Sequence, residues 1–179
     1  MKAFHPLDCP VLEQIQQEAL DYIDTHTMIW NGFWNKIDSQ DFLKHNKTVF
    51  KYCYSLGYAI NEVALLVADK SSTAPRIHID ELPIVAKINF PILNASTATT
   101  EWYDVPNLDK LEKRLNVFGE EVVTFETDNY PVIAKSNMDT PIVFNSRIPH
   151  AVVTSENTVY PRIVLACMSS NQPLEFLRP

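Results

Sequence analysis

The 179-residue sequence predicts a mainly β fold with N-terminal helices, and two observations lead to this prediction. Apolar residues recur at helical spacing in the first third of the chain, whereas from Tyr58 onward short apolar runs are separated by turn residues. Many short strands after a helical start favour a closed or double-layered antiparallel architecture over a doubly wound parallel sheet. The length indicates one domain over residues 1–179, with a helical part at 1–57 packed on a β core at 58–179.

Two helices are expected in the N-terminal part. The first covers about residues 11–23, where apolar side chains share one face and Glu and Gln occupy the other. The second is expected from about Gln40 to Leu56, with Ser39 as its N-cap. Gly57 stands where a left-handed residue would end that helix.

The β core is expected to contain seven strands, each a short apolar run bounded by turn residues. They cover Glu62–Ala68, Arg76–Asp80, Ile84–Leu93, Val122–Glu126, Pro141–Phe144, Ala151–Thr154 and Arg162–Met168. One further helix is expected at Asn107–Asn116, because Leu108, Leu111 and Leu115 would share a face there.

Charge and composition narrow the class of partner and the compartment. A net charge of -7 and a pI near 5.2 argue against nucleic acid, because phosphate binding needs clustered Lys and Arg. No segment approaches the length of a membrane span, so no membrane partner is expected. Cys9, Cys53 and Cys167 lie far apart and form no CxxC pair, which predicts three free thiols in a reducing cytoplasm.

Two short motifs suggest a metal site. His78 and Asp80 lie two apart in a predicted strand, so their side chains would project from one face, about 7 Å apart along the backbone. With His150, which follows Pro149, they would make a 2-His-1-carboxylate set that suits non-haem Fe(II) and leaves positions open. Each motif alone is weak, because such residues also occur by chance, so the hypothesis depends on their combination. Arg162 adds a cation that can hold a carboxylate by two parallel hydrogen bonds.

These motifs and their surroundings resemble the Fe(II)/2-oxoglutarate-dependent oxygenase superfamily, in particular its small phytanoyl-CoA dioxygenase-like and aspartyl/asparaginyl-hydroxylase-like members. The resemblance covers roughly Glu62–Ser169 and implies a double-stranded β-helix, the jelly roll also found in cupins, with the metal site at its mouth. The runs that carry it are Ile77–Asp80, Ala86–Asn94, Thr100–Tyr103, Val143–Val152 and Pro161–Leu165.

The resemblance implies a role for each motif residue. His78, Asp80 and His150 would hold Fe(II) as the catalytic centre, and Arg162 would pair with the distal carboxylate of 2-oxoglutarate, the co-substrate. The implied reaction is the hydroxylation of a C–H bond in a small molecule, an amino acid or a protein side chain, with succinate and CO2 as co-products.

A second contact to 2-oxoglutarate is left open. Some relatives carry a hydroxyl residue two positions after the arginine, where this chain has Val164. Asn89, Lys87, Asn94 and Tyr103 are therefore candidates, in that order. For Lys87 a solvated strand face is the preferred interpretation, and Asn94 would serve equally well as a turn residue.

Two alternative functions remain open on the same fold. A cupin-type metal enzyme would not use 2-oxoglutarate, but its site normally needs further histidines. His5, His26 and His45 all lie in the helical part without ligand-like spacing. A binding module without turnover is the other alternative, although an intact ligand set counts against it. The segments expected to select the substrate are Ile29–Trp34, Ser71–Pro75 and Ala95–Thr100.

Overall fold

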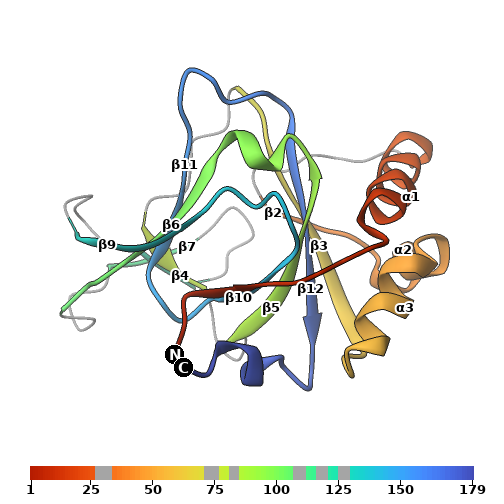
Figure 1. Cartoon of the computed structure of the whole chain (residues 1–179). Helices are drawn as coiled ribbons and strands as arrows, with labels where there is room; N and C mark the ends of the chain where they lie inside the picture. The colour runs from red at the N-terminus through yellow and green to blue at the C-terminus, as the bar shows by residue number, and fades with distance from the viewer. Residues whose placement is uncertain (27–33, 71–76, 81–84, 107–111, 116–120, 125–129) are drawn as a thin grey trace.

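The structure is a computed structural model that describes residues 1–26, 34–70, 77–80, 85–106, 112–115, 121–124 and 130–179. It is mainly β, with two antiparallel six-stranded sheets and a small group of helices beside one of them (Figure 1). The predicted segments at 29–33 and 71–75 lie outside the described residues.

The first sheet forms the centre of the molecule and contains the longest strands. In spatial order its strands are β1 (Phe4–Pro6), β10 (Ile142–Asn145), β5 (Ala86–Leu93), β12 (Arg162–Ser169), β3 (Ile60–Ala68) and β2 (Trp34–Lys36). All neighbours in this order are antiparallel. The last long strand, β12, therefore lies between two strands that precede it by many residues.

The second sheet is built from shorter strands. Its spatial order is β7 (Glu112–Leu115), β8 (Glu121–Thr124), β4 (His78–Ile79), β11 (His150–Val153), β6 (Thr99–Tyr103) and β9 (Val132–Ser136), again with antiparallel neighbours. Along the chain, β3, β5, β10 and β12 fall in the first sheet, whereas β4, β6, β9 and β11 fall in the second. The chain thus passes repeatedly from one sheet to the other.

The helices lie together against one face of the first sheet, beside β3 and β5 (Figure 1). They are α1 (Leu12–Thr25), α2 (Ser39–His45) and α3 (Lys47–Ser55), and two short 3-10 helices, η1 (Ala95–Thr97) and η2 (Leu174–Leu177), follow later in the chain. The N- and C-terminal segments meet where the amide of Lys2 donates to the carbonyl of Leu177 (2.7 Å). No helix among the described residues is long and apolar enough to cross a lipid bilayer.

Strand alternation divides the first sheet into two packed faces. Residues on one face of β5, among them Ile88 and Phe90, pack with helix residues such as Ile15 and Phe42 in the larger hydrophobic cluster. The opposite face contributes to a second cluster that contains Trp102 of the second sheet. The buried members of that cluster are Leu66, Ala95, Trp102, Met138, Ile142, Phe144, Val164 and Ala166. Side chains on this inner face therefore lie between the two sheets.

The N-terminal helices differ in two details from the sequence prediction. The cap of α2 is Asp38 rather than Ser39, because the Asp38 carboxylate accepts from the amides of Gln40 and Asp41. The predicted single helix is broken at Asn46, whose side-chain amide donates to the carbonyl of Phe42 and competes with the helical pattern. Gly57 has the expected left-handed backbone, with φ at 88°.

The predicted strands are confirmed in their described parts, with ends shifted by a few residues, but the helix at 107–116 is wrong. Glu112–Leu115 forms strand β7, paired with β8, and the rest of that segment lies outside the described residues. Four further strands, β1, β2, β6 and β9, were not among the predicted elements. The three cysteines are free, as expected, and two of them are buried.

Candidate metal centre

The two histidines of the predicted site lie side by side on neighbouring strands. His150 opens β11 and pairs in register with His78, which opens β4. Asp80 follows β4 directly, and its amide donates to the carbonyl of Ser146 (3.2 Å), which attaches it to the turn before His150. Ile79 points to the other face, into a cluster with Tyr103 and Ala151, as strand alternation requires.

The three side chains converge on a small volume. The Oδ1 atom of Asp80 lies 3.6 Å from Nε2 of His78 and 3.8 Å from Nε2 of His150. One ligand atom from each residue lies within 4.8 Å of the other two. The imidazole centroids of His78 and His150 are 4.4 Å apart with their planes at 54°, so the rings are inclined rather than stacked. Atoms at these separations can reach adjacent positions around one ion.

The electrostatics favour the protonation states that a metal requires. Burial, with the nearby His78 and Lys87, lowers the pKa of His150 to about 3, so this imidazole is neutral at physiological pH. Its Nδ1 lies 2.9 Å from the carbonyl of Ile148, which can only accept a hydrogen bond. The proton is therefore on Nδ1, and the lone pair of Nε2 faces the site.

The carboxylate of Asp80 is kept ionised by its neighbours. Burial alone would raise the pKa of Asp80, but Lys87 and the two histidines outweigh it and lower this pKa well below its usual range. A neutral histidine and an ionised carboxylate are the forms in which these side chains bind a divalent ion. The donor set therefore fits Fe(II).

Lys87 is buried, so the prediction that it lies on a solvated strand face is wrong. Its side chain is only 4% exposed, and its ammonium contacts Oδ2 of Asp80 at 2.5 Å. The same ammonium lies 5.0 Å from the centre of the Phe144 ring. Lys87 alternates along β5 with Ile88, which faces the helices, so it must point between the sheets. A lysine inside a mostly apolar strand was the signal available in the sequence.

An aromatic side chain packs against His150 on the inner side. Phe144 meets His150 edge-on, with centroids 4.7 Å apart, and also contacts the fully buried Trp102 at 5.0 Å. The indole of Trp102 donates to the carbonyl of Asn145 (3.3 Å) and stacks on Phe4. These contacts fix the β10–β11 turn that carries His150.

Arg162 is buried between the sheets, with 1% of its surface exposed. Its Nε donates to the carbonyl of Ala95 (3.3 Å), and its Nη2 lies 4.0 Å from the sulfur of Met138. Burial lowers the pKa of Arg162 to about 10, so the guanidinium remains charged near neutral pH. No acidic side chain among the described residues forms an ion pair with it. A buried cation in this state is costly unless an anion joins it.

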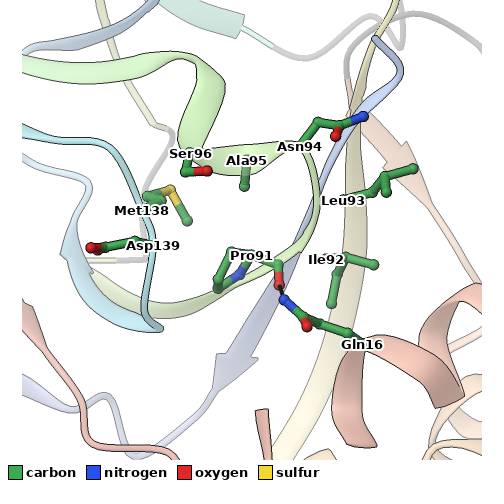
Figure 2. A pocket seen from close by; sticks show the side chains of 9 residues that line it. All are labelled: Gln16, Pro91, Ile92, Leu93, Asn94, Ala95, Ser96, Met138 and Asp139. Carbon is green, nitrogen blue, oxygen red and sulfur yellow. Dashed lines mark hydrogen bonds between the residues drawn. The ribbon is translucent and has the colours of Figure 1, made fainter. Parts of the chain in front are cut away.

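A pocket of about 160 Å³ opens beside the residues that contact Arg162 (Figure 2). Ala95 and Met138 line it, together with Asn94, whose φ is 51°. Asn94 donates from its side chain to the carbonyl of Pro161 (2.9 Å), so it acts as a turn residue that supports the start of β12. None of the three metal-site residues lines this pocket.

Asn89 and Tyr103, the remaining candidates for a second contact to 2-oxoglutarate, differ in where their side chains point. Asn89 lies two residues after Lys87 on the same face of β5 and is 2% exposed, and its Oδ1 has no hydrogen-bond partner among the described residues. Tyr103 lies on the opposite face of β6 from Trp102, in the cluster with Ile79, and donates to Glu101 (2.8 Å). The structure therefore brings Asn89, but not Tyr103, between the sheets.

Comparison with models of known protein families gives no match to this chain. Comparison with curated proteins gives no match either. What can be said of its function therefore follows from the side chains just described.

Proposed function

We propose that the protein is an Fe(II)- and 2-oxoglutarate-dependent dioxygenase that hydroxylates a C–H bond of a small molecule, an amino acid or a protein side chain. The observation that carries the proposal is a cluster of two histidines and one carboxylate, together with a buried guanidinium that forms no ion pair with the described side chains. His78, Asp80 and His150 would hold the metal, and Arg162 would hold a carboxylate. A dicarboxylate co-substrate needs both kinds of group, one at each end.

The strand order supports a double-stranded β-helix as the scaffold. In the first sheet β3, β12, β5 and β10 are neighbours, and in the second sheet β4, β11, β6 and β9 are neighbours. In each group of four, the first strand in chain order lies beside the last, the last lies beside the second, and the second lies beside the third. A jelly roll has the same arrangement. On this scaffold β4 and β11 bring the two histidine ligands into register.

Open coordination positions favour a catalytic ion over a structural one. Structural sites usually surround a metal with four protein ligands, whereas three ligands leave room for co-substrate and O2. When bound, Fe(II) and 2-oxoglutarate would supply the O2 activation and oxidative decarboxylation on which the reaction depends.

The chain's own residues would position the metal and 2-oxoglutarate and exclude water from them. Lys87 holds Oδ2 of Asp80, so Oδ1 stays directed toward the two histidines. The Ile148 carbonyl holds His150 in the tautomer that presents Nε2. Arg162 would donate two parallel hydrogen bonds to the distal carboxylate of 2-oxoglutarate, and Asn89 would offer a further polar contact. The Phe144 ring covers one side of His150 and would keep water from it.

The test is Fe(II)-dependent formation of succinate from 2-oxoglutarate and O2 by the purified protein, with candidate substrates added in turn. The proposal predicts turnover by the wild type and its loss in His150→Ala and Asp80→Ala. His5→Ala, which changes a β1 histidine that packs on Phe176 and is not part of the triad, serves as the matched control and should remain active. Iron binding without succinate formation would instead favour a cupin-type enzyme, and absence of iron binding would favour a binding module.

A further inference from the structure

A second group of side chains that could bind a metal lies outside the two sheets, where α1 and α2 meet. His26 directly follows α1, while Asp41 and His45 lie one turn apart on α2. Nε2 of His26 is 3.3 Å from Oδ2 of Asp41, and Nδ1 of His45 is 3.6 Å from Oδ1 of the same carboxylate. One ligand atom from each residue lies within 4.8 Å of the other two. The expectation that these histidines have no ligand-like spacing is therefore wrong, because helix packing joins them.

Both imidazoles are held in a tautomer that can bind a metal. Nδ1 of His26 lies 2.9 Å from the carbonyl of Tyr22, and Nδ1 of His45 lies 2.9 Å from the carbonyl of Asp41. Because a carbonyl can only accept, the proton belongs on Nδ1 in each ring. The unprotonated Nε2 of His26 is the atom that faces the Asp41 carboxylate, whereas in His45 the atom that faces it is the protonated Nδ1, so a metal would bind His45 through Nε2. Backbone carbonyls commonly orient metal-binding histidines in this way, and Ile148 does the same for His150 in the barrel.

Tyr22 contacts two of the three residues of this cluster. Its hydroxyl donates to Oδ2 of Asp41 (3.0 Å), and its ring stacks on His26 with centroids 3.9 Å apart. The Tyr22 ring also packs edge-on against the buried Phe42 of α2, so its position is fixed by the core. One buried side chain therefore orients both the carboxylate and an imidazole.

We propose that His26, Asp41 and His45 form a second metal site, which takes a divalent transition-metal ion such as Zn²⁺. Two imidazoles and one carboxylate are suitable ligands for this class of ion. The side chains are 33%, 38% and 47% exposed, so water can complete the coordination. The ion would connect the C-terminus of α1 to α2 and stabilise the folded state. This inference is independent of the proposed function of the barrel.

The direct test is the number of Zn²⁺ ions bound by the metal-free protein, measured in competition with a chromophoric chelator. His45→Ala is the main variant, because this side chain is nearly half exposed and its loss should leave the fold intact. We expect His45→Ala to bind one equivalent fewer than the wild type, and His5→Ala to bind the same number. Equal stoichiometry and affinity in His45→Ala and the wild type would overturn the proposal.

A second measurement separates this site from the barrel. In a His150→Ala background, Zn²⁺ should raise the melting temperature, and the further change His45→Ala should abolish that rise. Tyr22→Phe, which keeps the ring and removes the hydroxyl, should weaken Zn²⁺ binding at this site by about 10-fold or more without changing its stoichiometry. A Zn²⁺-induced rise that persists in the double variant would contradict the assignment of the ligands.

Discussion

The ammonium of Lys87 contacts one carboxylate oxygen of Asp80, while the other oxygen of that carboxylate faces both histidines. Asp80 can therefore present a single oxygen to a metal while its second oxygen and its charge are balanced by the protein. The contact also gives Lys87, whose side chain is only 4% exposed, an acidic partner.

We expect Lys87→Met to destabilise the metal-free protein by about 2 kcal/mol at neutral pH, because it leaves the Asp80 carboxylate without its buried partner. The pKa of Asp80 should rise at the same time. Urea denaturation measures the free energy of unfolding, and Lys51→Met, which changes an exposed lysine, is the matched control. Adding Asp80→Asn to Lys87→Met should recover part of the loss. Purely additive effects of the two changes would show that the pair is not coupled.

Acid should destabilise the folded protein through His150. Its pKa is about 3 in the folded state and about 6.5 in an unfolded chain, so the unfolded state binds one more proton between these values. Stability therefore falls as the pH falls through this window, by up to about 1.4 kcal/mol per pH unit. His150→Gln should show a flatter dependence in urea denaturation of metal-free protein between pH 7 and pH 4. The same slope in both proteins would refute the burial of a neutral imidazole.

Arg162→Lys should weaken 2-oxoglutarate binding by about 10-fold or more, because a lysine cannot form the two parallel hydrogen bonds of a guanidinium. Anaerobic calorimetry in the presence of Fe(II) measures the dissociation constant. Arg178→Lys, which makes the same change at an exposed position, should leave it unaltered. Unchanged affinity in Arg162→Lys would remove this residue from co-substrate binding.

Asp38→Ala should cost about 1 kcal/mol of stability, because the amides of Gln40 and Asp41 lose their acceptor. Asp38→Asn should cost much less, since asparagine caps helices about as well as aspartate. Thermal unfolding compares the two variants directly. If Asp38→Asn were as destabilising as Asp38→Ala, charge rather than the cap hydrogen bonds would explain the effect.

The sequence could predict the triad because its geometry follows largely from local rules. The two-residue period of a strand directs His78 and Asp80 to one side, and the structure brings His150 into register beside them. The long apolar strands were predictable for the same reason. The strand Glu112–Leu115 was not predictable in this way. The leucines at 108, 111 and 115 are three and four residues apart, and this spacing fits a helix as well as a short strand.

Residues whose roles depend on packing could not be placed in advance. Lys87 is buried because both faces of β5 are covered, which depends on strands far away in the chain. The meeting of His26 with Asp41 depends in the same way on how α1 packs against α2. Tyr103 and Trp102 are adjacent in sequence, and only the register of β6 decides which of them faces inward.

The most direct test of the proposed activity is an anaerobic titration of the metal-free protein with Fe(II) and then with 2-oxoglutarate. A keto acid chelated to the iron gives a visible charge-transfer band. We expect this band in the wild type and its loss in His150→Ala. In Arg162→Lys the band should still form, but only at a higher concentration of 2-oxoglutarate. Tight iron binding without any band in the wild type would contradict the proposal that this protein uses 2-oxoglutarate.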